Sequence, residues 1–349
     1  MTLEKPVRRR LDFKNGRVDL SHGAGGRAMG QLIEDVFVAA FDNDWLRAGN
    51  DPSAFDVAAG RMVMTTDAYV VSPIFFPGGD IGSLAVNGTI NDIAMAGARP
   101  LYLSASFVIE EGFPLADLRR IAASMGEAAR GAGAPIIAGD TKVVERGKAD
   151  KVFISTAGVG VAPPGLNLSS DAARPGDVVI LSGTIGDHGV AVMSKRENLE
   201  FETEIRSDSA ALHGLVAQMV ATAGLSLRGM RDPTRGGLAA TLNELAHQSR
   251  VGFSIQEAAI PVRAEVAAAC EFLGLDPLNV ANEGKLVAIV APQGAQALLA
   301  AMRAHPLGAE AAIIGSAVED DNRFVEMRTA FGGGRIVDWL AGEQLPRIC

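Results

Sequence analysis

The sequence predicts a mixed α/β (α+β) protein with two domains and a separate C-terminal tail. Its 349 residues correspond to roughly two domains at about 150 residues each. Hydrophobic residues make up 48% and charged residues 21% of the chain, enough apolar material for sizeable cores. Strand and helix patterns alternate in both halves, and two Pro/Gly clusters, 163–165 and 173–176, separate the halves. A globally disordered chain is therefore excluded.

Apolar runs in the first half alternate with helix-like segments. Strands are expected at 61–67, 101–109, 134–140 and 151–161. Small residues at 80–97 predict a closely packed helix, and apolar residues at helical spacing predict a second helix at 114–131. Residues 1–40 are expected to form an N-terminal arm and a Gly-rich loop, and residues 41–165 the first domain.

The second half repeats this rhythm from residue 166 to residue 337. Strands are expected at 177–183, 285–291 and 311–318, and helices at 209–223, 237–249 and 294–304. Gly332–Gly334 is interpreted as a flexible hinge, and residues 338–349 as a mobile tail beyond it.

Charge and cysteine content narrow the functional classes. The net charge of −9 and the isoelectric point near 5.2 argue against general binding to nucleic acid or to a membrane surface. No apolar run is long enough for a transmembrane helix, and the N-terminus has no secretory pattern. Two cysteines, Cys270 and Cys349, are too few for a disulfide framework. We expect a cytoplasmic protein.

A Gly-rich loop at 23–28 (GAGGRA) fits the loose dinucleotide pattern GxGxxG/A. Backbone amides in such turns can converge on an anion because no Cβ blocks the approach. Only a weak segment precedes the loop, and no Walker A motif occurs in the chain. Taken alone, the pattern is at least as typical of an ordinary turn.

Four aspartates lie among small or apolar residues at expected strand or helix ends in the first half. They are Asp51, Asp67, Asp92 and Asp140. Carboxylates in such surroundings are costly unless they are solvated or paired with a cation. A convergent group would suit Mg²⁺, which prefers oxygen ligands and bridges to phosphates. Each aspartate by itself is equally consistent with a turn or a helix cap.

Further candidates have weaker local signals. Lys142 follows Asp140 closely and could meet a phosphate or act as a base, or be a surface lysine. In the second half, Asp232 and Glu283 lie in loops rich in Gly. His188 is interpreted as a structural histidine because no second His lies at ligand spacing.

The last residue of the sequence is a cysteine, Cys349, in the segment PRIC. A thiol on a hinged tail has unusual reach, and its thiolate would be a nucleophile. The alternative is a cysteine that stands there by accident.

Together these segments resemble the HypE family of hydrogenase maturation proteins. The resemblance extends from about residue 18 to the end and rests on TTDAYVVSPIFFPGGDIGSLAVNGTINDIAMAGARPLYLS, AGDTKVVERG, SGTIGDHGVAV, RDPTRGGLAATLNELA, NEGK and the terminal PRIC. This family lies within the superfamily of aminoimidazole ribonucleotide synthetase, selenophosphate synthetase and thiamine-monophosphate kinase.

The resemblance implies the two-domain aminoimidazole ribonucleotide synthetase-like fold, with residues 41–165 binding ATP and forming a homodimer through their strands. It implies that ATP and Mg²⁺ support dehydration of a carbamoyl group on Cys349 from S-carboxamide to S-cyanate. HypF would supply the carbamoyl group, and the HypC–HypD complex would accept cyanide for the iron of [NiFe]-hydrogenase.

The implied site residues fall into three groups. Asp51, Asp67, Asp92 and Asp140 would hold Mg²⁺–ATP, with Asp232 as a further metal candidate, and Gly25, Gly26, Asn91 and Thr141 would contact the nucleotide. Lys142 and Glu283 would orient the carboxamide and move protons, and which of them is the base stays open. Two alternatives stay open as well: a small-molecule kinase or synthetase of the same superfamily, and a non-catalytic thiol carrier.

Overall fold

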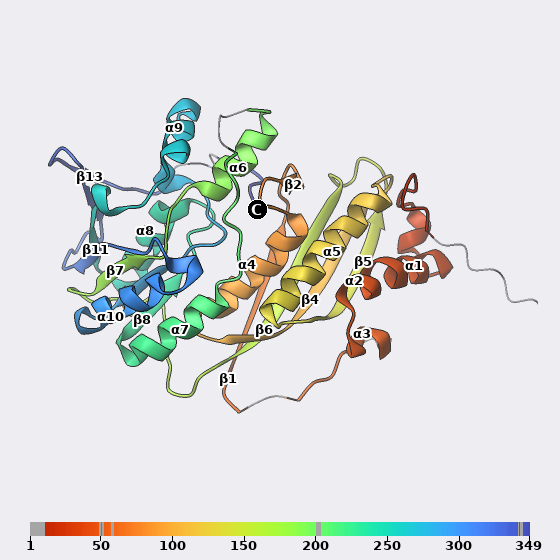
Figure 1. Ribbon diagram of the computed structural model, residues 1–349, viewed down its shortest axis with the longest axis horizontal. Coiled ribbons are helices and arrows are strands. Elements are labelled where there is room, and N and C mark those ends of the chain that lie inside the picture. Colours follow the sequence, from red (N-terminus) through yellow and green to blue (C-terminus); the bar gives the residue numbers. More distant parts are fainter. Residues whose placement is uncertain are drawn as a thin grey trace, which may run out of the picture.

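The computed structural model places a separate β-sheet in each half of the chain (Figure 1). The structure describes residues 11–48, 50, 52–56, 59–199, 204–340, 342 and 345–349. Both halves combine strands with helices, which confirms the predicted mixed α/β class. No helix in these ranges combines the length and the apolar character needed to cross a bilayer.

The first half begins with short helical segments and continues as a four-stranded sheet with two long helices. Its elements are α1 (Arg27–Leu32), the π-helix η2 (Ile33–Val38), α2 (Ala39–Phe41), α3 (Asp44–Ala48), β1 (Arg61–Tyr69), β2 (Phe75–Phe76), β3 (Gly79–Asp80), α4 (Ile81–Met95), β4 (Arg99–Glu110), α5 (Leu115–Ala132), β5 (Ile136–Val144) and β6 (Val152–Ala162). The expected strands and helices of this half are all present, with ends that differ by a few residues.

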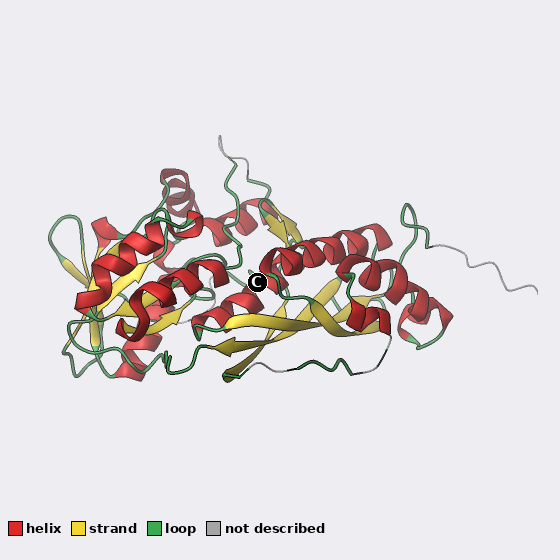
Figure 2. Ribbon diagram, turned by 60° about the horizontal axis from the view of Figure 1, so that its bottom comes forward, coloured by secondary structure: helices red, strands yellow, loops and turns green. Residues whose placement is uncertain are grey.

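The four-stranded sheet has the order β1-β6-β4-β5, with only the β4–β5 pair parallel. Helices α4 and α5 lie on the same side of it (Figure 2). Side chains alternate along each strand, so one set packs under these helices and the other remains on the open face. Met64, which is 74% exposed, lies on that open face.

Residues 27–41 are helical, whereas the sequence analysis expected an arm and a loop up to residue 40. The reason is an apolar stripe at helical spacing: Leu32, Val36, Phe37 and Phe41 are all buried in the first core. The segment consists of short α-helices on either side of a π-helical stretch, which makes it harder to predict from the sequence than one continuous α-helix. The Gly-rich loop precedes this segment, as the 3₁₀ turn Leu20–Gly23 and the residues that follow it.

The second half contains a seven-stranded sheet with helices on both faces. Its elements are β7 (Val178–Leu181), α6 (Asp187–Arg196), α7 (His213–Ala223), β8 (Leu227–Arg231), α8 (Gly237–Ser249), β9 (Gly252–Gln256), α9 (Ala264–Leu273), β10 (Val287–Val290), α10 (Pro292–Arg303), β11 (Ala312–Val318), β12 (Val325–Arg328) and β13 (Gly334–Ile336). The strand order is β13-β12-β9-β11-β7-β10-β8. In β7, Val179 faces the cluster that contains α8, and Ile180 faces the cluster that contains α7 and α10.

The chain after β12 differs from its prediction. Gly332–Gly334 is not a hinge before the tail: Gly332 and Gly333 lie in the turn of the β12–β13 hairpin, and Thr329 N donates a 2.8 Å hydrogen bond to Gly333 O. The chain then returns to the junction of the two halves, where the C-terminus lies (Figures 1 and 2). Leu345 and Ile348 are buried in the first core cluster. The mobility of the tail stays a prediction.

Candidate active site at the junction of the two halves

A cavity of about 120 Å³ lies where the two halves meet, and Cys349 lines it. The first half contributes the end of β1 and the middle of α4. The second half contributes the segment after β8 and the loop before β10. The acidic side chains at the cavity are Asp67, Asp92, Asp232 and Glu283. Four of the predicted site acids thus meet the terminal cysteine in one place.

Asp67 and Asp92 come from two elements that pack against each other. Alternation along β1 turns Thr65, Asp67 and Tyr69 toward α4. Thr65 Oγ1 donates a 2.8 Å hydrogen bond to Asp92 Oδ2. Burial and the nearby Asp67 carboxylate raise the pKa of Asp92, although the hydrogen bond from Thr65 opposes the shift.

Glu283 lies in a loop that is fixed by its backbone. The Asp208 carboxylate accepts hydrogen bonds from the backbone N–H of Glu283 (3.0 Å) and Gly284 (3.2 Å), and Lys285 Nζ lies 3.1 Å from Asp208 Oδ2. Asn91 Nδ2 donates to the carbonyl of Glu283 (3.2 Å). The Glu283 carboxyl is thereby held in the cavity by contacts that do not involve the carboxyl itself.

Asn282 connects the Glu283 loop by hydrogen bonds to the turn after Asp232 and to the residue before α6. Its Nδ2 donates to Pro233 O (2.9 Å), which fixes the turn that follows Asp232, and its Oδ1 accepts from Gly186 N (2.8 Å). Burial, followed by the Asp92 carboxylate, raises the pKa of Asp232 to about 7. Burial and then Asp232 raise the pKa of Glu283 well above its ordinary value.

Comparisons with known proteins agree on one family. The model for the N-terminal domain of AIR synthase related proteins matches residues 49–162, and the model for the C-terminal domain matches residues 174–328. The carbamoyl dehydratase HypE of Rhizobium leguminosarum bv. viciae is 79% identical over 345 residues, 99% of both chains.

The chain belongs to the HypE family.

Two solved HypE structures show the same fold. A crystal structure of the hydrogenase maturation protein HypE in complex with ATP has a TM-score of 0.91 and 50% identity, covering 95% of this chain and 99% of that one. A HypE–HypF complex has a TM-score of 0.78 at 50% identity, covering 88% and 99%. These matches confirm the predicted family and its two-domain, AIR synthase related fold.

Not all predicted residues of this HypE family member meet at the cavity. Asp51 lies outside the described residues. Asp140 and Lys142 lie on β5, where Lys142 Nζ and Asp140 Oδ2 are 2.9 Å apart on the open face of the sheet. Three strand spacings, roughly 14 Å, separate β5 from β1, which carries Asp67.

The other predicted nucleotide ligands lie either near β5 or beside the cavity. Thr141 is buried on the opposite face of β5, under the helical segment of residues 29–41. Gly25 and Gly26 lie in the Gly-rich loop, and this loop packs on β5 through Gly23, where a Cβ would lie 2.7 Å from Val143 N. Asn91 is buried beside the cavity and uses both hydrogens of its amide on backbone carbonyls. Their roles in nucleotide binding stay predictions.

The acidic group suits a hard cation such as Mg²⁺. Its donors are all carboxylate oxygens, and buried Glu283 Oε1 has no hydrogen-bond partner among the described residues. As the side chains lie, no three His, Cys, Asp or Glu residues in the described part of the chain are close enough to hold a metal ion. These carboxylates would therefore have to move before they could share one ion.

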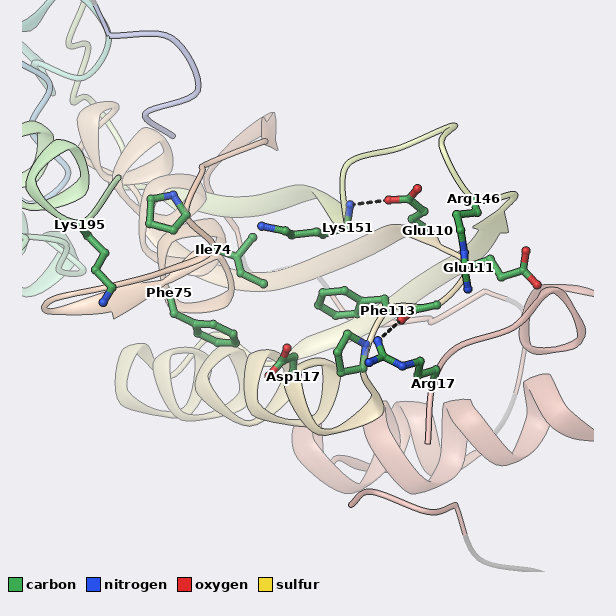
Figure 3. Close-up of a pocket in the computed structure, with 13 residues that line it drawn as sticks. Arg17, Ile74, Phe75, Glu110, Glu111, Phe113, Asp117, Arg146, Lys151 and Lys195 are labelled. Carbon is green, nitrogen blue, oxygen red and sulfur yellow. Dashed lines mark hydrogen bonds between the residues drawn. The ribbon is translucent and has the colours of Figure 1, made fainter. Parts of the chain in front are cut away.

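A larger cavity lies elsewhere in the described part of the chain. It measures about 860 Å³ and lies between the start of α5, the end of β4 and Lys151, the residue before β6. Figure 3 shows it with Phe75 and Phe113 beside charged side chains, including Arg17 and Lys195. None of the predicted site residues in the described part of the chain lines it, so cavity volume does not point to the predicted site.

Asp208 and Gly88 support the site, although neither was predicted from the sequence. Asp208 organises the Glu283 loop, and Gly88 makes room for Tyr69, because a Cβ at Gly88 would lie 2.2 Å from the Tyr69 hydroxyl oxygen. A single aspartate in a loop or a single glycine in a helix does not form a sequence motif that indicates a function. Glu283 lies 75 residues after Asp208, and Tyr69 lies in a different element from Gly88, so the residues next to each of them in sequence do not reveal these contacts.

We predict that Asp232→Asn removes a pH-dependent loss of stability. The pKa of this carboxyl is about 7 in the folded chain and near 3.8 in the unfolded chain, so its ionisation destabilises the fold progressively from about pH 4 to pH 7. Relative to wild type, the free energy of unfolding of the variant should therefore rise by about 2 kcal/mol from pH 5.5 to pH 8. The rise occurs over the roughly 1.5 pH units between pH 5.5 and the pKa of about 7, at about 1.4 kcal/mol per unit, and the difference is constant above that pKa.

Urea denaturation in chelator-containing buffer at both pH values measures this difference. Asp44→Asn, which removes an exposed carboxylate from α3, is the matched control and should show no such rise. Parallel pH profiles for Asp232→Asn and wild type would contradict the raised pKa.

Proposed function

We propose that this chain dehydrates a carbamoyl group on Cys349, converting the S-carboxamide to an S-cyanate with ATP and Mg²⁺. The observation that carries the proposal is the position of Cys349 in the same 120 Å³ cavity as Glu283 and three aspartates from both halves. Membership of the HypE family supports the reaction class, and the solved HypE–ATP complex supports the nucleotide.

The chemistry needs an oxygen that can leave and a nitrogen that can lose protons. An amide oxygen is a poor leaving group, and transfer of the γ-phosphoryl group of ATP to it would make it a good one. Loss of phosphate and of the N–H protons then gives the nitrile of the S-cyanate. Positioning and charge neutralisation are the main demands of the phosphoryl step.

The acidic side chains suit these demands. Asp67, Asp92 and Asp232 would hold Mg²⁺, which supplies charge neutralisation to the nucleotide phosphates when bound. Glu283 lies at the cavity with Cys349, whereas Lys142 is paired with Asp140 on β5. We therefore favour Glu283 as the base that takes the amide proton. Burial, the largest cause of its raised pKa, makes the carboxylate a better proton acceptor than an ordinary glutamate.

A homodimer would give the β5 residues a role. The open face of the four-stranded sheet carries Met64 and Val108 as exposed apolar side chains, and Asp140 and Lys142 lie on the same face. A second copy packed on that face would cover the apolar side chains and enclose both charged residues in the interface. The nucleotide site would then draw on two chains.

The proposal includes two transfers at the same thiol. HypF would load the carbamoyl group, in keeping with the solved HypE–HypF complex, and the HypC–HypD complex would accept the cyanide in the cytoplasm. Both partners need Cys349 outside the cavity, so the tail must leave its observed position and return.

Intact mass spectrometry tests the reaction directly. When the carbamoylated chain is incubated with Mg²⁺ and ATP, we expect the peptide that contains Cys349 to lose the mass of one water, and Cys349→Ala to prevent loading. ATP hydrolysis without water loss would favour a kinase-like activity, and transfer from Cys349 without hydrolysis would favour a carrier. Either result would overturn the dehydratase proposal.

A further inference from the structure

We propose that His188, Arg196 and Asp150 are positioning residues that hold the last three residues of the chain docked at the cavity. They do so through hydrogen bonds and an ion pair to Ile348 and Arg347, and we call this set of contacts the lock. This inference rests on the proposed function only for its effect on turnover. The lock itself is a property of the tail and can be measured without any reaction.

His188 holds the backbone of Ile348 from the second half. It is fully buried in α6, and its Nε2 lies 2.8 Å from Ile348 O, with its Nδ1 2.8 Å from Ser207 Oγ. A carbonyl can only accept, so Nε2 carries the proton and Ser207 Oγ–H donates to Nδ1. Ser207 Oγ also accepts from Ser209 N (3.1 Å). One tautomer is therefore fixed, with its N–H directed at the tail.

Arg196, at the end of the same helix, bridges the tail and the first half. Its Nε donates to Ser72 O (2.8 Å), and its Nη2 donates to Arg347 O (2.8 Å). These two bonds use the planar fork of a guanidinium, which holds two carbonyls in a defined relative position. The carbonyl of Arg347 also accepts from Ser72 N (3.1 Å).

Arg347 closes the lock from the tail side. Its Nη1 is paired with Asp150 in the β5–β6 connection, and its Nε donates to Val70 O (3.0 Å). Val70 N donates in turn to the backbone oxygen of Cys349 (3.1 Å). The tail thus pairs with the segment 70–72 almost as an added strand, with hydrogen bonds at alternate residues.

The backbone of Arg347 is held in an unfavourable conformation. Its φ of 55° is in the left-handed region, which is unfavourable for a residue with a side chain. The surrounding contacts must compensate for that conformation, so the docked shape persists only while they hold. The tail should therefore switch between docked and released states when a few of these bonds are lost.

All of these contacts reach backbone oxygens or the Arg347 side chain, and none of them involves the Cys349 sulfur. A loaded and an unloaded cysteine can consequently dock by the same contacts. Groups from both halves of the chain take part, so docking also requires the two halves to be in their observed arrangement. The lock thus fixes the position of the backbone that carries the sulfur.

Modification of Cys349 by iodoacetamide measures the docked fraction. The reagent needs a thiolate and free approach, and a small cavity lined by carboxyl groups restricts both. Cys270 does not compete, because it is buried and its burial raises its pKa to about 11. Peptide mass spectrometry on the full chain reports each cysteine separately.

We expect Asp150→Asn and Arg196→Gln each to speed modification of Cys349 by roughly three- to tenfold, the effect of losing one partly exposed charge-assisted bond. Both side chains are partly solvent-exposed, so neither variant threatens the core. Asp44→Asn, which breaks an exposed ion pair with Arg47 on α3, should leave the rate unchanged. His188→Gln, which keeps an N–H donor, should accelerate modification less than His188→Ala.

A second readout separates the lock from the reaction. In a single turnover of the carbamoylated chain, Asp150→Asn should slow water loss by a factor similar to its effect on modification. Wild-type modification rates in both surface variants would overturn the lock. Faster modification with unchanged water loss would overturn its role in positioning. Absence of water loss in wild type, with graded modification, would overturn the proposed function and leave the lock supported.

Discussion

Glu283→Gln is expected to slow dehydration of the Cys349 carboxamide by roughly two to three orders of magnitude, because a positioned general base contributes about that much. The substitution keeps the size of the side chain and removes only its ability to take a proton. The Glu283 loop is held through its backbone by Asp208 and Asn91, so the loop should keep its position. Single-turnover mass spectrometry of water loss measures the rate.

The controls for this variant follow from the structure. Glu271→Gln changes an exposed glutamate on α9 in the same way and should react at the wild-type rate. Lys142→Ala, which breaks the pair with Asp140, tests the other candidate base and should fold normally while dehydrating weakly. Near-normal turnover by Glu283→Gln together with a collapse in Lys142→Ala would assign the base to Lys142 and contradict the role of Glu283.

The sequence predicted part of the site because its signal is local. Asp67, Asp92, Asp232 and Glu283 all lie at the cavity that Cys349 lines. Asp232 and Glu283 were selected from loops rich in Gly, and Asp67 and Asp92 were selected as acids among small or apolar residues. The same criterion also selected Asp140, which lies on β5, roughly three strand spacings away from β1. Local composition identifies acids that need a partner, and only the strand order decides which of them share one.

The fold shows the same division between local and distant information. Helix α8 begins and ends as predicted at 237–249, since its apolar spacing and its flanking residues are local signals. Helix α7 was predicted from residue 209 but begins at His213. Leu212 N donates to Asn91 Oδ1, and Ala210 O accepts from Asn91 Nδ2, so distant contacts keep the preceding residues out of the helix. The order of the seven-stranded sheet depends on such contacts throughout.

Gly284→Ala is expected to lower the free energy of unfolding by roughly 3 kcal/mol, at the upper end of the cost of overpacking. A Cβ at this position would lie 1.8 Å from Asp208 O, a backbone atom that cannot move aside like the end of a flexible side chain. Asp208 is also the residue that holds Glu283 N, so relief of the clash must displace the Glu283 loop. The variant should therefore lose both stability and dehydration.

Gly131→Ala is the matched control, because it lies in α5 and its added Cβ would meet nothing within 4 Å beyond its chain neighbours and the surrounding helix backbone. That change should raise stability by about 0.5–1 kcal/mol, since alanine loses less backbone entropy in a helix than glycine. Urea denaturation of both variants gives the comparison. Equal stability of Gly284→Ala and wild type would mean that Asp208 and the Glu283 loop can separate without cost, which contradicts the rigid loop on which the proposed role of Glu283 depends.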